Sequence, residues 1–260
     1  MSTASPTLAR PSRPLRRLVG AEFLKLRRRR ALLWASVALI VAPVLLSYAL
    51  DAVLHAADPA KYGPAGGAAG LADRLHALTL IGAVAFVLIG VNAGGGDLAA
   101  GVFRELVVTG RSRLALFTAR IPGGLALLLP LVALAFAIAA VASVALAAPG
   151  QAPDAGLLLR DAAWLALAAT VTFCLALGVS SLLDSRATAI GLLLAWQLAV
   201  APLLLQSGKL DFLLPNAALD RLQPDGPGAS LSPAAAVVVL AVWTLVPLAA
   251  GAWRTHTRDA

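Results

Sequence analysis

Charged residues are scarce in this chain. They make up 13% of its 260 residues, whereas a typical soluble domain carries about 25%. Hydrophobic residues reach 60%, and the mean hydropathy is +0.85. Long apolar stretches contain no Asp, Glu, Lys or Arg, and the charges gather in the segments between them. This composition and this segregation exclude a water-soluble protein and are typical of a multi-pass membrane protein.

Cysteine and histidine are also rare. Cys174 is the single cysteine and lies inside an apolar stretch, so it forms neither an internal disulfide nor a CxxC metal pair, and we interpret it as a small packing residue. The three histidines, His55, His76 and His256, lie in loops or near the ends of apolar stretches, without an HExxH motif or another ligand spacing. No metal site is expected.

Motifs for chemistry and for energy coupling are missing as well. No ionisable residue lies within the apolar stretches, although ion-driven carriers normally bury such groups along their path. There is no HExxH, no GxSxG and no pair of acids in a stretch, and Lys209 lacks the GxxxxGK[ST] context of a phosphate-binding loop. We therefore expect no enzyme activity and no ATP binding in this chain. Any energy for transport must come from a partner.

Six apolar stretches are long enough to cross a membrane as helices, since about 20 residues at 1.5 Å each span the hydrocarbon layer. The sequence therefore predicts an all-α polytopic membrane protein with spans at about 31–50, 77–96, 121–148, 162–183, 187–208 and 232–253. Prolines Pro43, Pro130, Pro202 and Pro247 are expected to kink their spans.

The positive charges predict the orientation. Sixteen of the 21 Lys and Arg residues lie before the first span, between spans 2 and 3, between spans 4 and 5, or in the tail, and five lie in the alternate segments. By the positive-inside rule both termini are cytoplasmic, as an even number of spans requires. We interpret the net charge of +8 as a topology signal rather than a nucleic-acid site. Arg and Ala far outnumber Lys, which favours a bacterial origin and a bacterial plasma membrane.

The N-terminal segment divides into two parts. Residues 1–14 are expected to be a disordered basic arm, because Pro6, Pro11 and Pro14 interrupt any helix. Residues 15–260 are expected to form one transmembrane domain. In its first part, residues 15–30, apolar side chains recur at helical spacing: Leu15, Leu18, Val19, Phe23 and Leu26. This pattern predicts an amphipathic helix on the cytoplasmic leaflet. The alternative is a disordered arm that extends through these residues. The apolar stretch that follows exceeds the 7–15 residues usual in a signal peptide, so no cleavage is expected.

Small residues recur at every fourth position in two spans, which places them on one helix face and predicts close packing against another helix. An alanine-rich sequence also produces such runs by chance. The candidate packing residues are Ala135, Ala139, Ser143 and Ala147 in the third span and Ala162, Ala166, Thr170, Cys174 and Gly178 in the fourth.

The segment from Asp97 to Arg120 is the longest predicted cytoplasmic loop between spans. Leu98, Val102 and Leu106 form an apolar stripe, so the first half predicts a short amphipathic helix, and a second short helix is expected from Arg113 to Arg120. An amphipathic helix held between two spans can transmit a push from a docked partner into the bundle.

These residues resemble the coupling-helix region of type-2 ATP-binding-cassette exporter permeases. The passage Gly96-Asp97-Leu98-Ala99-Ala100-Gly101-Val102-Phe103-Arg104-Glu105-Leu106 and the later Ser112-Arg113-Leu114 carry the resemblance. Asp97 stands where the family usually has Glu, Gly101 matches, Val102 replaces the usual Thr, and Arg113 and Arg120 match basic positions. Two further segments are similar to the family: Ala21-Glu22-Phe23-Leu24-Lys25-Leu26, and Leu213-Leu214-Pro215-Asn216-Ala217-Ala218-Leu219 in the last external loop.

The resemblance implies a permease with six spans per subunit, two subunits around a shared path, and a separate cytosolic ATPase dimer that binds ATP and Mg²⁺. It also implies ATPase-coupling roles for Asp97, Gly101, Arg104, Glu105, Arg113 and Arg120. The expected activity is export of an amphipathic or lipid-like compound, with membrane lipids as the other partner. The residues alone leave open an ordinary solvated loop at 97–120, an ATP-independent scaffold or assembly protein, and a secondary carrier.

Overall fold

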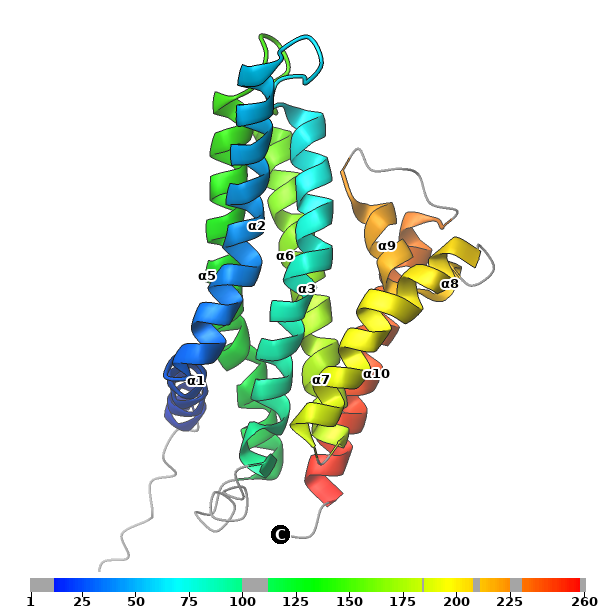
Figure 1. Ribbon diagram of the computed structural model, residues 1–260. Coiled ribbons are helices and arrows are strands. Elements are labelled where there is room, and N and C mark those ends of the chain that lie inside the picture. Colours follow the sequence, from blue (N-terminus) through cyan, green and yellow to red (C-terminus); the bar gives the residue numbers. More distant parts are fainter. Residues whose placement is uncertain (1–11, 100–111, 184, 208–210, 225–230, 258–260) are drawn as a thin grey trace, which may run out of the picture.

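The computed structural model describes residues 12–99, 112–183, 185–207, 211–224 and 231–257. Every element within these ranges is helical (Figure 1). In chain order they are α1 (Ser12–Arg27), α2 (Arg30–Ala57), α3 (Ala68–Ala99), α5 (Arg113–Ala145), α6 (Ala155–Leu182), α7 (Arg186–Ala195), the π-helical turn η1 (Trp196–Val200), α8 (Ala201–Ser207), the short 3₁₀ turn η2 (Asp211–Leu213), α9 (Pro215–Leu222) and α10 (Pro233–Thr257).

The prediction of a multi-pass membrane protein is confirmed, since the described residues contain six helical segments long and apolar enough to cross a membrane. They are α2, α3, α5, α6, the continuous α7 to α8 segment, and α10. The helices extend beyond the predicted spans: α2 continues to Ala57, and α3 begins at Ala68 instead of residue 77. A helix of 28 to 33 residues is about 42–50 Å long, so its ends reach past a hydrocarbon layer of about 30 Å.

The predicted loop from Asp97 to Arg120 is shorter in the structure, because both of its ends belong to helices. Residues 97–99 are the last part of α3, and residues 113–120 are the first two turns of α5 rather than a separate short helix. The Ser112 side chain accepts a hydrogen bond from the backbone N–H of Ala115 at 3.2 Å, which caps α5 at this point. Pro122 lies inside α5 and does not interrupt it. The predicted amphipathic helix through Gly101, Arg104 and Glu105 lies outside the described residues.

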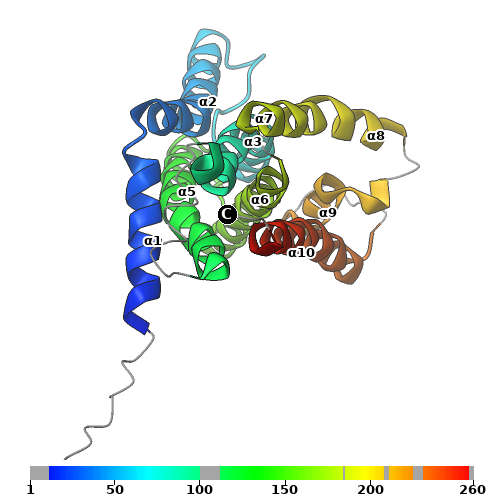
Figure 2. The ribbon, with the colours of Figure 1, turned by 90° about the horizontal axis from the view of Figure 1, so that it is seen from below.

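The helices α3 and α6 form the centre of the bundle. In the most apolar stretch of each, 61% of the residues are buried, against 17% in α2 and α10. Gly90 on α3 permits their close approach, because a Cβ atom there would lie 2.7 Å from the Phe173 backbone oxygen of α6. Figure 2 shows α2 and α5 on one side of this pair and α7, α8 and α10 on the other. The largest hydrophobic cluster lies between α2, α3, α5 and α6.

Helix α1 and the carboxyl end of α10 lie at the same end of the bundle (Figure 1). We call it the α1 end. The opposite end carries the 58–67 and 146–154 connections, and α9 lies toward it. Helix α1 is seen end-on in Figure 1 and lengthwise in Figure 2, so it runs across the direction of the long helices.

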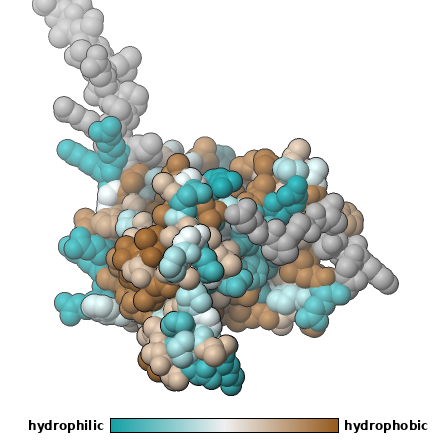
Figure 3. Space-filling view, turned by 90° about the horizontal axis from the view of Figure 1, so that it is seen from above, coloured by the Kyte–Doolittle hydropathy of each residue, from teal (hydrophilic) through white to brown (hydrophobic). Residues whose placement is uncertain are grey.

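The outward faces of the long helices are apolar. Exposed side chains include Trp34 and Leu46 on α2, Val141 on α5 and Leu245 on α10, each more than 60% exposed. Figure 3, which looks onto the end opposite α1, shows hydrophilic residues in the loops of that end beside hydrophobic side chains of the bundle. An apolar surface of this kind is stable against lipid and unstable against water.

Prolines lie inside four of the six membrane segments. Pro43, Pro130 and Pro247 are in the interiors of α2, α5 and α10. Pro202 follows the π-helical turn η1, where the backbone N–H of Ala201 bonds to the oxygen of Trp196, five residues earlier. A proline has no N–H to continue an α-helical ladder, and a π turn is one way to absorb the resulting mismatch.

Candidate functional site

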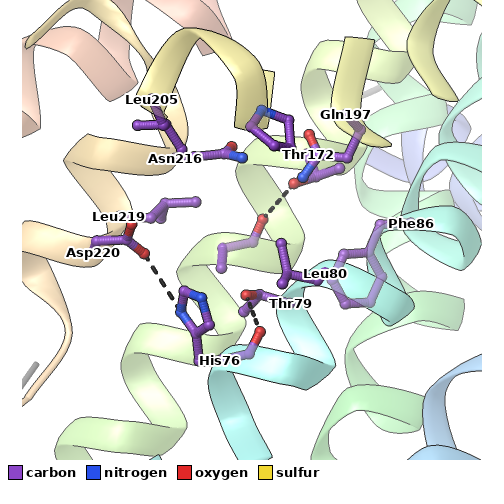
Figure 4. A pocket seen from close by; sticks show the side chains of 12 residues that line it. His76, Thr79, Leu80, Phe86, Thr172, Gln197, Leu205, Asn216, Leu219 and Asp220 are labelled. Carbon is purple, nitrogen blue, oxygen red and sulfur yellow. Dashed lines mark hydrogen bonds and ion pairs between the residues drawn. The ribbon is translucent and has the colours of Figure 1, made fainter. Parts of the chain in front are cut away.

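A cavity of about 240 Å³ lies between α3, α6, the η1 to α8 segment and α9 (Figure 4). Its walls combine polar groups with apolar side chains from helices that are far apart in the sequence. The polar residues that line it are His76, Thr79, Thr172, Gln197, Asn216 and Asp220, and the apolar ones are Leu80, Phe86, Ala168, Pro202, Leu205 and Leu219.

Helix α9 forms one wall of the cavity, and two hydrogen bonds fix its position. Pro215 is at the start of α9, where a proline fits because its missing N–H is not needed there. The indole Nε1 of Trp164 on α6 donates a buried hydrogen bond to the Leu219 backbone oxygen at 2.8 Å. Just after α9, the Gln223 amide nitrogen donates to the Ala72 backbone oxygen of α3 at 3.2 Å. The helix is therefore attached to both central helices of the bundle.

A second Trp contact holds the segment before α9. The indole Nε1 of Trp243 on α10 donates to the Leu213 backbone oxygen at 2.8 Å, and its ring centroid lies 5.3 Å from that of Trp196 in η1. Because α10, η1 and η2 meet here, the chain enters α9 from a defined direction.

The only ion pair that lines the cavity among the described residues joins α3 to α9. His76 Nδ1 lies 3.6 Å from Asp220 Oδ1 (Figure 4). Burial raises the pKa of the Asp220 carboxyl above its ordinary value, and the charge on a protonated His76 lowers that pKa in part. Protonation of the Asp220 carboxyl weakens the attraction between α3 and α9.

The two threonine hydroxyls of the cavity bond to their own helices. Thr79 Oγ1 donates to the His76 backbone oxygen at 2.7 Å, and Thr172 Oγ1 donates to the Ala168 backbone oxygen at 3.0 Å. The hydroxyl oxygens remain acceptors, and the amides of Gln197 and Asn216 supply both donors and acceptors. Polar groups at a few points on apolar walls suit an amphipathic ligand.

Potential metal ligands do not gather in the described part of the chain. Across residues 12–99, 112–183, 185–207, 211–224 and 231–257, no three His, Cys, Asp or Glu side chains are grouped so that they could hold a metal ion.

Two of the six predicted ATPase-coupling residues, Arg113 and Arg120, have described side chains. Arg113 starts α5, and its Nη1 donates to the His256 backbone oxygen of α10 at 3.2 Å. Arg120 is 1% exposed, and its Nη1 donates to the Gly94 backbone oxygen of α3 at 2.8 Å. Asp97 belongs to the last turn of α3, but its side chain is not among those described, and Gly101, Arg104 and Glu105 lie outside the described residues.

The small residues of the third span lie where α5 meets the core. Ala135, Ala139 and Ser143 are fully buried on α5, and the Ser143 hydroxyl is hydrogen-bonded to the phenol oxygen of Tyr48 on α2. Ala147 lies beyond the end of α5 at Ala145 and so does not belong to that helix face.

In the fourth span, Gly178 is at a close crossing of α6 and α10. A Cβ atom there would lie 2.6 Å from the Pro247 backbone oxygen. Cys174 is buried in the core of α6, whereas Ala166 and Thr170 are half-buried, and Thr170 Oγ1 bonds to the Ala166 backbone oxygen at 2.7 Å. The structure thus separates Gly178, at a helix crossing, from Ala166 and Thr170, nearer the surface.

The cavity itself was not predicted from the sequence. Gln197 is recognisable as a polar residue in a span, and the Leu213 to Leu219 segment carries a family resemblance, but His76 and Asp220 fall in segments expected to be loops. The sequence spacing could have indicated one polar wall of the cavity. His76 and Thr79 are three residues apart, so they share a helix face when α3 begins at Ala68.

No protein-family model matches the chain, and no curated protein matches its sequence.

Proposed function

We propose that this chain is the membrane-spanning subunit of an ATP-driven exporter that works with a separate ATPase polypeptide and moves an amphipathic or lipid-like compound out of the cell. In this proposal the α1 end faces the cytosol of a bacterium, and two permease subunits, identical or different, share one path. The charge distribution supports this orientation, since 16 of 21 Lys and Arg residues lie in segments that the alternation of spans places on the α1 side.

The observation that carries the proposal is the buried bond between Arg120 and Gly94. It joins the first part of α5 to the last part of α3, the two helices that flank residues 100–112. Gly94 also packs against α6, because a Cβ atom there would lie 2.5 Å from the Leu177 backbone oxygen. A force applied to residues 100–112 by a docked ATPase would therefore reach three membrane helices together.

Helix α1 supports the same function. It packs on α5 at Gly123, where a Cβ atom would lie 2.6 Å from the Glu22 Cβ, and its Leu26 is fully buried. Arg16, Arg17 and Arg27 are exposed. This arrangement suits a helix that lies on the cytoplasmic leaflet and borders the surface where an ATPase docks.

The cavity between α3, α6, α8 and α9 is the proposed contact site for the transported compound on the outer side. Its mixed lining is compatible with an amphipathic molecule, and α9 forms one of its walls. Movement of α9 would then control release.

The first experiment measures coupling. The chain is co-expressed with the ATP-binding-cassette ATPase encoded nearest to it, and we expect co-purification and stimulated ATP hydrolysis. The variant Gly101→Trp should abolish ATP-dependent efflux while membrane insertion stays intact. Gly63→Trp is the matched control, because nothing lies within 4 Å of a Cβ atom at Gly63. No association with any ATPase, or unchanged efflux in Gly101→Trp, would contradict the proposal.

The second experiment measures orientation. In a Cys174→Ala background, Arg113→Cys should react with a membrane-impermeant thiol reagent only after the cells are opened, whereas Lys61→Cys should react in intact cells. Labelling of Arg113→Cys from outside would exclude a cytosolic docking site at this end. Association with an ATPase without any ATP-dependent efflux would favour the scaffold alternative.

A further inference from the structure

Three membrane helices meet at the amide of Asn92 near the α1 end. The Nη1 atoms of Arg29, at the start of α2, and of Arg186, at the start of α7, both donate to Asn92 Oδ1 on α3, at 2.5 Å and 3.2 Å. Both bonds end on the same oxygen, so the Nη1 atoms of Arg29 and Arg186 lie no more than about 5.7 Å apart. Asn92 Nδ2 donates to the Leu88 backbone oxygen at 2.8 Å, which keeps Oδ1 turned toward the two guanidinium groups.

Two positive charges thus share one neutral acceptor. Within the described part of the chain, neither Arg29 nor Arg186 forms an ion pair. The carboxylate of Glu22, on the preceding helix α1, is paired with Lys25. The amino ends of α2 and α7 add further positive potential, and no side chain caps α2 at Arg29. The charges of the described groups at this point favour an anion.

An apolar strip continues from Asn92 along α3. Leu88, Val84 and Ile81 precede it at helical spacing, so they share its face. Leu88 and Val84 are half-buried, and Ile81 is 44% exposed. Helix α3 packs against both α2 and α7, and Figure 2 shows it between them. The two arginines therefore lie at the end of an accessible apolar strip that runs along the membrane direction.

We propose that Arg29, Arg186 and Asn92 bind the phosphate of an anionic phospholipid in the leaflet at the α1 end, with an acyl chain along Leu88, Val84 and Ile81. Phosphate groups of that leaflet lie at the level where the spans begin and end, and both arginines are at the starts of their spans. A free phosphate would use the two guanidinium groups but would leave the apolar strip without a role. The site requires only that the bundle lies in a membrane and does not depend on the transport proposal.

The decisive experiment uses the unmodified chain. It is purified in mild detergent, and native mass spectrometry is recorded with added phosphatidylglycerol, phosphatidylcholine or inorganic phosphate. We expect one phosphatidylglycerol to be retained at detergent levels that strip phosphatidylcholine. Equal retention of the two lipids would overturn the proposal. The proposal would also be overturned if inorganic phosphate displaced phosphatidylglycerol and the site bound the lipid no better than the free phosphate.

Paired variants locate the site. Arg29→Gln with Arg186→Gln should weaken phosphatidylglycerol retention about twenty-five-fold, since each arginine near a lipid headgroup strengthens binding by a factor of about five. Lys61→Gln with Arg160→Gln removes the same charge from exposed positions at the end opposite α1 and should leave retention unchanged. Equal loss in both pairs would show a general charge effect and overturn the site. If the first pair does not fold, the comparison of lipids on the unmodified chain still decides the question.

Discussion

The indole N–H of Trp164 on α6 is hydrogen-bonded to the backbone oxygen of Leu219 on α9, and the bond is buried. This contact holds a short helix of eight residues against the centre of the bundle. Helices of this length are not stable alone in water, so α9 depends on its tertiary contacts. The wall of the cavity is therefore only as rigid as the contacts at Trp164, His76 and Gln223.

Removal of the indole donor should loosen α9. The change Trp164→Phe leaves the buried Leu219 oxygen without this partner, at a cost of about 2 kcal/mol. We expect a lower thermal midpoint in detergent and faster hydrogen exchange confined to residues 215–222. Trp34→Phe is the control, because Trp34 is 67% exposed on α2. Exchange that accelerates equally in both variants would show that the bond does not hold α9.

Neutralising Asp220 should stabilise the protein at high pH. Burial raises the pKa of this carboxyl, so its ionised form costs folding free energy, and the cost grows as the pH rises from the ordinary carboxyl range through the raised pKa. Below that range the carboxyl is protonated in both folded and unfolded states, and the cost is absent. We therefore expect Asp220→Asn to have a higher thermal midpoint than the parent at pH 8 and a similar one near pH 4.

The control for this comparison is Asp73→Asn, which removes an exposed carboxylate from α3. Its midpoint should follow the parent at both pH values. A midpoint for Asp220→Asn below the parent at pH 8 would mean that the attraction to His76 outweighs the cost of burial.

The crossing of α6 and α10 should be intolerant of a methyl group. In Gly178→Ala the new Cβ would lie 2.6 Å from the Pro247 backbone oxygen, which does not belong to a flexible side chain. Overpacking of this kind costs about 1–3 kcal/mol. Gly191→Ala, with nothing within 4 Å, should be neutral or slightly stabilising. Thermal midpoints of the two variants measure the difference, and similar midpoints would show that α10 can shift without cost.

Loss of the Arg120 guanidinium should weaken the contact between α3 and α5. Arg120→Met keeps the bulk but removes the donor to the Gly94 oxygen, and hydrogen bonds that involve charged groups contribute about 1.5–3 kcal/mol. We expect a lower thermal midpoint by size-exclusion fluorescence and, under the transport proposal, lower ATP-dependent efflux. Arg28→Met, at an exposed position, should change neither. Normal stability with lost efflux would assign Arg120 to coupling rather than to the fold.

Hydropathy predicted the six membrane segments well but their ends poorly. The interior of each span is apolar along its whole length, so local composition identifies it, whereas the first eight residues of α3 continue a helix through Asp73 and Arg74. Those charges suggested a loop. Arg74 is instead paired with Asp51 on α2 and lies over the Tyr48 ring, so tertiary contacts keep the helix intact beyond the apolar stretch.

The sequence by itself determined the membrane class, the number of spans and the asymmetry of charge, because each depends on which residues are adjacent in the chain. Tertiary structure decided the rest. His76 and Asp220 are 144 positions apart, and Arg29, Asn92 and Arg186 come from three different helices, so their meeting depends on how the helices pack. Small residues such as Gly90 and Gly178 allow the close approach that sets this packing, and the side chains brought together by it form the cavity and the arginine site.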